Sequence, residues 1–260
     1  MKKVGIIVLL ITLISCSTSN EIDESIETVE TKPESSVTTS DTEEDTVNES
    51  TTTTSVIESF KFDKEKMSPF TGIELPPELW LKRPRRVLAF KIDNNINSRP
   101  QSGIQEADAV FEILVEGGMT RFLAFFYDKI STYLGPIRSA RPTDPTIVRP
   151  YGGILVVSGA TDGLVPQIRE LGVPVLQEQP APSMFRTSDR KPPHNLYGDT
   201  ELVRQVIDRK GMTFNPPPGS VYRFGNNQDN WLVGSARVII KYSEFTTIVW
   251  KLDGDQYSRF

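Results

Sequence analysis

Cysteine and histidine are almost absent from this sequence, which has one of each in 260 residues. The cysteine, Cys16, follows an apolar run near the N-terminus, and its predicted modification there leaves no thiol for a disulfide, a thiolate nucleophile or a zinc–thiolate site. Because His194 stands alone, a histidine-rich metal centre is excluded. An all-oxygen Ca²⁺ or Mg²⁺ site stays open but has no signature here. We therefore predict no metal and no cofactor.

The N-terminal apolar run, residues 4–13, is too short for a membrane-spanning helix, which needs about 20 apolar residues. It follows Lys2 and Lys3 and precedes Cys16, which is the order of a signal peptide. Residues 13–16, Leu-Ile-Ser-Cys, resemble the bacterial lipobox, and this resemblance implies a diacylglyceryl group on the cysteine. Two acyl chains anchor a protein stably where one does not. The sequence thus predicts a lipoprotein signal peptide over residues 1–16 and a protein held by Cys16 at the extracytoplasmic face of the cell membrane. The alternative is an ordinary signal peptide with an incidental cysteine.

Residues 17–60 have few apolar side chains and charge of almost one sign. They hold twenty Ser or Thr and twelve Asp or Glu against the single Lys32. Such a composition buries too little apolar surface to offset chain entropy, so we predict a disordered stalk. Residues 51–54, four threonines, are a possible glycosylation site, although a solvated spacer is the simpler interpretation.

Charge is distributed unevenly along the chain. The net charge of −5 divides into +2 for residues 1–16, −11 for residues 17–60 and +4 for residues 61–260. A mildly basic folded region favours anionic partners such as wall polymers, although +4 over 200 residues is also an ordinary value. The predicted extracytoplasmic location argues against nucleic acid as a partner.

Apolar runs of strand length, bounded by Gly, Pro, Asn and Asp, dominate residues 61–260. Helical spacing of apolar residues occurs twice, before Gly172 and before Gly211. The pattern predicts an α+β fold with mixed or antiparallel sheets and a few packed helices. The predicted strands are 87–92, 109–115, 121–127, 154–157, 221–224, 237–242 and 247–252, and the predicted helices are 161–171 and 200–210. Gly117-Gly118 predicts a hairpin between the second and third strands. The proline run at 216–218 separates an N-terminal domain, 61–215, from a strand-rich domain beginning at Gly219.

Six motifs in order along residues 68–200 resemble the YerB-like lipoproteins, a bacterial family built on a two-part domain of unknown function. They are Ile92-Asp93-Asn94, Arg99-Pro100-Gln101-Ser102-Gly103, Ala107-Asp108-Ala109-Val110-Phe111-Glu112, Glu116-Gly117-Gly118-Met119-Thr120-Arg121-Phe122, Gly135-Pro136-Ile137-Arg138-Ser139-Ala140-Arg141 and Pro193-His194-Asn195-Leu196-Tyr197. One departure is Ser158, where the family often has a histidine, and this weakens any mechanism that uses two imidazoles. Residues 249–260 resemble the opening of the family's second domain.

The C-terminal pattern predicts that this second domain is incomplete. A strand at 247–252, a turn at Asp253-Gly254 and a returning strand at 256–260 form a hairpin, which is marginal without further strands. The resemblance implies that such strands follow. We therefore expect residues 219–260 to be the start of a strand-rich domain.

The polar residues of these motifs fall at predicted strand ends and in loops, where functional groups are usually displayed. The candidate ligand-binding residues are Asn94, Arg121, Arg138, Arg141 and Asn195. The three arginines offer planar donor forks that suit phosphate or carboxylate. The structural alternative is that they form internal ion pairs between elements.

Catalytic templates fit the sequence poorly. No Gly-x-Ser-x-Gly elbow accompanies His194, which argues against a serine triad. Glu112 and Glu116, if both lay in one strand, would be about 13 Å apart, which argues against that pair acting alone as a glycosidase.

Two functional hypotheses of different classes therefore stay open. The first is a lipoprotein that binds an anionic envelope ligand, a wall polymer or a peptidoglycan fragment. The second is an envelope hydrolase or phosphodiesterase in which Asp93, Glu112, Glu116 and His194 supply the catalytic groups. Whether the carboxylates and His194 converge or are engaged in internal ion pairs separates the two.

Overall fold

The structure, a computed structural model, describes residues 61–80, 86–212, 219, 222, 235–254 and 256–260. The predicted signal peptide and stalk lie outside these residues. Among the described residues, no helix is long and apolar enough to cross a membrane.

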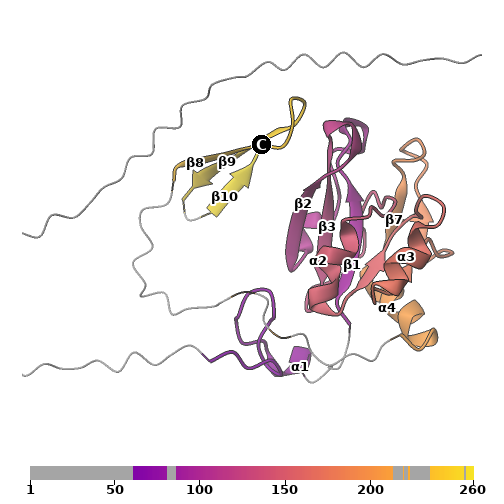
Figure 1. Cartoon of the computed structure of the whole chain (residues 1–260). Helices are drawn as coiled ribbons and strands as arrows, with labels where there is room; N and C mark the ends of the chain where they lie inside the picture. The colour runs from indigo at the N-terminus through magenta and orange to yellow at the C-terminus, as the bar shows by residue number, and fades with distance from the viewer. Residues whose placement is uncertain (1–60, 81–85, 213–218, 220–221, 223–234, 255) are drawn as a thin grey trace, which may run out of the picture. The chain divides into compact units, whose positions relative to one another are not determined.

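A five-stranded mixed sheet forms the centre of the N-terminal region (Figure 1). Its strand order is β2-β3-β1-β4-β5. The strands are β1 (Leu88–Asp93), β2 (Ala109–Leu114), β3 (Thr120–Phe126), β4 (Ile154–Val156) and β5 (Val175–Leu176). β2, β3 and β1 pair antiparallel, whereas β1, β4 and β5 pair parallel. The predicted α+β class with mixed sheets is confirmed.

The central strands β1, β3 and β4 are buried on both faces, which explains why their sequences are mostly apolar and do not alternate between apolar and polar residues. In β1, Leu88, Phe90 and Ile92 belong to one core cluster, which α4 (Thr200–Arg209) covers. Ala89 points to the other face and joins the cluster that contains residues of α2 (Asp144–Val148) and α3 (Leu164–Glu170). Because side chains alternate between the two faces along each strand, each central strand contributes to two separate cores.

Short helices and strands connect these elements. They are α1 (Pro77–Trp80), β6 (Met184–Arg186), β7 (Leu196–Gly198) and the 3₁₀ turns η1 (Ile96–Ser98), η2 (Ile104–Glu106), η3 (Glu116–Gly118) and η4 (Arg149–Tyr151). β6 and β7 form a separate antiparallel pair. The predicted hairpin at Gly117-Gly118 is confirmed, because η3 joins β2 to its antiparallel partner β3.

The two predicted helices exist, and their bounds follow from local chemistry. The first begins at Leu164 rather than at 161, because Gly163 has a left-handed backbone with φ of 78°. The second, α4, begins after Asp199, whose side chain accepts hydrogen bonds from two backbone amides of the first turn. α2 was not predicted.

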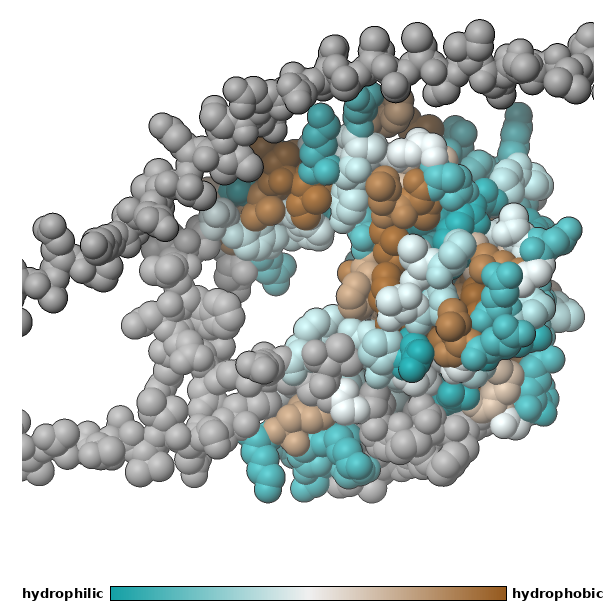
Figure 2. Space-filling model, in the orientation of Figure 1, coloured by the Kyte–Doolittle hydropathy of each residue, from teal (hydrophilic) through white to brown (hydrophobic). Residues whose placement is uncertain are grey.

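A second, three-stranded antiparallel sheet comprises β8 (Arg237–Lys241), β9 (Thr247–Asp253) and β10 (Gln256–Arg259). It confirms a separate strand-rich region near the C-terminus. The predicted strand 221–224 lies, apart from Tyr222, outside the described residues. Exposed apolar side chains include Ile239 of β8 and Phe245 in the turn between β8 and β9, and Figure 2 shows hydrophobic patches on the molecular surface.

Candidate functional site

The backbone of residues 136–140 crosses the carboxyl ends of β1 and β4. The amide of Arg138 donates to the Lys91 carbonyl over 2.8 Å, and the Arg138 carbonyl accepts from the Ser158 amide over 3.1 Å. This segment therefore lies between β1 and β4, which pair directly with each other in parallel at Leu88–Phe90, nearer the start of β1. Carboxyl ends of parallel strands are the usual place for a ligand crevice in open α/β sheets. This crossing places residues 138–141 at the carboxyl ends of β1 and β4.

Asp93, the last residue of β1, contacts two side chains there, those of His194 and Arg138. Its side chain is only 3% exposed, and its Oδ2 lies 2.7 Å from His194 Nδ1 and 3.1 Å from Arg138 Nε. Arg138 also donates to the Pro193 carbonyl over 3.4 Å, which ties the loop carrying His194 to the crossing segment. A carboxylate on Nδ1 orients the ring and leaves Nε2 outside this contact. No residue in the described part of the chain hydrogen-bonds to that Nε2.

Glu116 bridges two of the three arginines. Its carboxylate forms a two-bond contact with the Arg141 guanidinium, Oε2 lying 2.6 Å from Nε and Oε1 contacting Nη2, and it lies 3.6 Å from Arg121 Nη2. The hydrogen bond from Arg141 lowers the pKa of Glu116 to about 2. The side chain of Glu116 is nevertheless 57% exposed. An accessible carboxylate therefore occupies donor forks that an external anion could also use.

Arg121, at the start of β3, is the most deeply buried of the three arginines. It is 5% exposed, and its Nη1 donates to the Ser139 carbonyl over 3.0 Å. Burial lowers the pKa of this guanidinium, and repulsion from Arg141 and Arg138 lowers it further. Positive charge is thus concentrated at this edge of the sheet. We call Arg121, Arg138 and Arg141 the arginine cluster.

A buried ion pair lies beneath the cluster. Lys91 Nζ is 2.6 Å from Asp144 Oδ1, and both side chains are fully buried. The other oxygen of Asp144 accepts from the backbone amide of Arg141 over 2.7 Å. Burial lowers the pKa of Lys91, while the charge of Asp144 acts in the opposite direction. The pair links β1 to the N-terminus of α2 and fixes the backbone from which Arg141 projects.

Glu112 does not join the cluster. Arg259 of β10 donates to both oxygens of the Glu112 carboxylate, from Nε over 2.9 Å and from Nη2 over 2.6 Å. Thr120 donates to the same carboxylate over 2.7 Å and accepts from Asn94. Glu116 follows the end of β2 instead of lying within it, so the two glutamates do not share one strand. Glu112 and Glu116 have separate arginine partners.

The two candidate asparagines are engaged within the fold. Asn94 is buried and also accepts from Arg99 and Gln101. Asn195 is buried, accepts from Arg186 over 3.0 Å and donates to the Thr187 carbonyl. Of the residues predicted as a site, Asp93, Glu116, His194 and the arginine cluster come together, whereas Glu112, Asn94 and Asn195 serve internal networks.

Sequence reasoning missed two members of this neighbourhood, Lys91 and Asp144, which form the buried pair. Ser139 also lies here, with its hydroxyl 3.4 Å from that of Ser158. One signal was available, because Lys91 is a charged residue within an apolar strand. Within the described residues, no group of three or more His, Cys, Asp or Glu side chains could hold a metal ion.

Comparison with known proteins shows which family this part of the chain matches. The family described as "Protein of unknown function (DUF3048) N-terminal domain" matches residues 70–213. A curated relative, "Putative lipoprotein YerB" of Bacillus subtilis (strain 168), is 31% identical over 150 residues, which are 57% of this chain and 44% of the relative. A crystal structure of the YerB protein from Bacillus subtilis superposes with a TM-score of 0.61 at 26% identity, covering 75% of this chain and 66% of that one. The chain thus spans less than half the length of the curated relative, and the resemblance drawn from the six motifs is confirmed.

Proposed function

This chain belongs to the DUF3048 family, and we propose that it is a lipid-anchored envelope protein whose arginine cluster binds an anionic ligand. The proposed location at the membrane rests on the lipobox-like residues 13–16 and on the name of the Bacillus subtilis relative, "Putative lipoprotein YerB". Cys16 carries the anchor in this proposal, and the membrane is its first partner.

The contact between Glu116 and two arginines is the observation that carries the binding proposal. The Glu116 carboxylate already has the planar, two-oxygen shape that a guanidinium fork recognises. It reaches the arginines from an exposed turn in which Gly117 and Gly118 have positive φ. An exposed ion pair contributes little to stability, about 0–1 kcal/mol, so an external anion can replace it at small cost.

The charges around this edge favour such a replacement. Lys91 and the arginine cluster supply four positive charges, against three negative charges from Asp93, Glu116 and Asp144. If Glu116 swings out to solvent, the remaining groups carry an excess of two positive charges. A ligand with phosphate or carboxylate groups, such as a wall glycopolymer or a peptidoglycan fragment, would balance this excess.

Alanine variants of the more accessible arginines test the proposal. Arg138 and Arg141 have side chains that are each 20% exposed, so replacing either should weaken binding of glycerol phosphate oligomers and muramyl peptides at least tenfold. Arg141→Ala should change the melting temperature by only a few degrees, whereas Arg138→Ala should lower it more, because it leaves the buried Asp93 with one partner fewer. Isothermal titration calorimetry measures the binding. The matched control is Arg186→Ala, which removes another guanidinium paired with a carboxylate, that of Glu178. Loss of stability without loss of binding would identify the arginines as structural pairs.

The Asp93–His194 pair supports a second candidate function, hydrolysis of a phosphodiester or related envelope bond. A buried carboxylate 2.7 Å from Nδ1 prepares the opposite nitrogen to act as a general base, and the adjacent arginines could stabilise a developing oxyanion. On this hypothesis, His194→Gln should reduce hydrolysis of bis(4-nitrophenyl) phosphate about 100-fold or more. Absence of any turnover by the unmodified protein would leave the binding function alone.

A further inference from the structure

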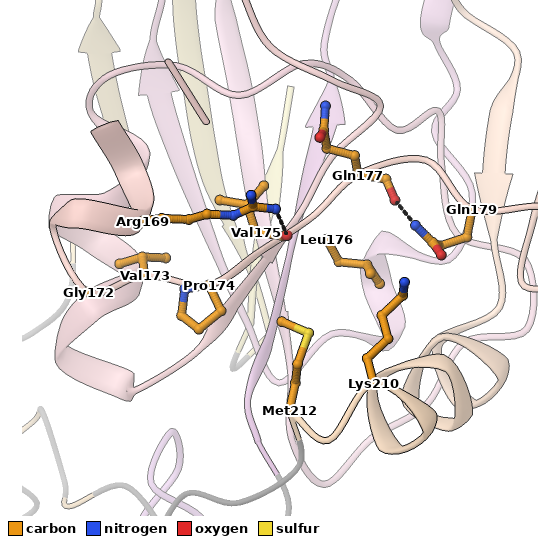
Figure 3. Close-up of a pocket in the computed structure, with 10 residues that line it drawn as sticks. All are labelled: Arg169, Gly172, Val173, Pro174, Val175, Leu176, Gln177, Gln179, Lys210 and Met212. Carbon is orange, nitrogen blue, oxygen red and sulfur yellow. Dashed lines mark hydrogen bonds between the residues drawn. The ribbon is translucent and has the colours of Figure 1, made fainter. Parts of the chain in front are cut away.

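A groove of 650 Å³ lies along β5, outside the arginine cluster and sharing no residue with it (Figure 3). Leu176 and Met212 supply apolar surface, while Arg169 from α3 and Lys210 from the end of α4 project from opposite sides. The remaining lining residues are Gly172, Val173, Pro174, Val175, Gln177 and Gln179. Sites for small ligands usually have volumes of about 300–1,000 Å³.

β5 is an edge strand, and its outward backbone groups face this groove. The carbonyls of Pro174 and Leu176 accept from β4, so the peptide groups of the alternate residues, Val175 and Gln177, point away from β4. Their carbonyls accept from side chains, Val175 from Arg169 Nη2 over 3.2 Å and Gln177 from Gln179 Nε2 over 2.8 Å. Their amides have no hydrogen-bond partner among the residues that the structure describes. The edge therefore offers two free donors and two carbonyls held only by long side chains.

The groove is also basic. None of the described residues that line it carries a carboxylate, and the Lys210 ammonium forms no ion pair with any described residue. A neighbouring groove of 440 Å³ shares Gln179 and Lys210 and adds Arg209. Charge complementarity therefore favours an acidic occupant.

We propose that this groove binds a short, extended acidic peptide that adds to the edge of β5 as a further strand. The peptide's amides would replace Arg169 and Gln179 on the two carbonyls, and its carbonyls would accept from the amides of Val175 and Gln177. An apolar side chain would pack on Leu176 and a carboxylate would pair with Lys210. Because only two outward peptide groups are available, three or four residues suffice. This proposal is independent of the arginine cluster.

Amide hydrogen exchange on the full chain tests the proposal at the predicted atoms. The probe is a library of acetylated tetrapeptides that alternate apolar and acidic residues. Peptides that bind should slow exchange at Val175 and Gln177 together, and methylation of the peptide's own amide nitrogens should abolish the effect. Lys210→Glu should weaken binding about fivefold or more, because an attractive contact becomes repulsive. Lys241→Glu on β8 is the matched charge control.

A matched pair at position 177 separates backbone recognition from side-chain recognition. Gln177→Pro removes one outward donor and leaves the β4 ladder intact, whereas Gln177→Ala keeps that donor. The proposal predicts weaker binding for the proline variant only. It is overturned if no library member slows exchange at 10 mM, if N-methylated peptides bind equally well, or if inorganic phosphate alone produces the same protection.

Discussion

Replacing Glu116 by glutamine should increase the affinity of the arginine cluster for anions. Glu116 contacts the Arg141 fork through both oxygens and lies 3.6 Å from Arg121, so in the free protein it competes with any ligand for these donors. Glutamine keeps the size of the side chain and removes its charge. A neutral amide cannot accept a charge-assisted pair of hydrogen bonds in the same way. The ligand would then no longer have to displace a carboxylate.

The size of the effect follows from the exposure of the pair. The lowered pKa of Glu116, about 2, indicates a strong local interaction, but the side chain is 57% exposed and solvent screens it. Exposed pairs are usually worth about 0.2–1 kcal/mol, and the two-bond geometry favours the upper part of this range. If the ligand no longer has to displace a pair worth about 1 kcal/mol, its affinity rises roughly fivefold.

Calorimetric titration with glycerol phosphate oligomers measures this gain. Glu178→Gln is the control, because Glu178 forms a similar two-bond contact with Arg186 on β6. We expect tighter binding for Glu116→Gln, unchanged binding for Glu178→Gln and weaker binding for Arg141→Ala. Equal affinities for the unmodified protein and Glu116→Gln would refute the competition argument, and weaker binding by Glu116→Gln would show that this carboxylate helps to hold the ligand.

Three further predictions concern the buried pair, acid stability and the anchor. Asp144→Ala should destabilise the fold by about 3–5 kcal/mol, because it leaves Lys91 buried without its partner, and the double variant with Lys91→Met should recover most of this loss in urea denaturation. Because the folded pKa of Glu116 is depressed from 4.5 to about 2, its contribution is present above pH 4.5 and is lost as the pH falls through 2. The melting temperatures of the unmodified protein and Glu116→Gln should therefore differ by at most a few degrees at neutral pH and converge near pH 2. Cys16→Ala should release the protein from membranes or block its maturation, and unchanged membrane fractionation with an intact Met1 would contradict the anchor.

Much of the main sheet was predictable because β1 and β3 are buried on both faces and the partly exposed β2 is still largely apolar. The apolar runs at β1, β2, β3 and β4 are interrupted by turn residues, so their positions follow from local sequence. β5, β6 and β7 have two or three residues each and, unlike the equally short β4, do not lie in an uninterrupted apolar run. Their existence depends on tertiary pairing.

The membership of the candidate site was only partly predictable. The glycine turn and the clustered arginines indicated Glu116, Arg121 and Arg141, but their mutual contact depends on the crossing of residues 136–140 between β1 and β4. No local pattern encodes such a crossing. The partner of Lys91 is likewise 53 residues away in sequence.

The arginine side-chain Nε–H signals of the ¹⁵N-labelled protein provide the most direct test of the central claim. Glycerol phosphate oligomers are added while the signals of Arg138, Arg141 and Arg186 are followed. The anion-binding account predicts that the Arg138 and Arg141 signals shift together and saturably with one dissociation constant, while the Arg186 signal stays in place. No saturable shift at Arg138 and Arg141, or equal shifts at all three arginines, would contradict it.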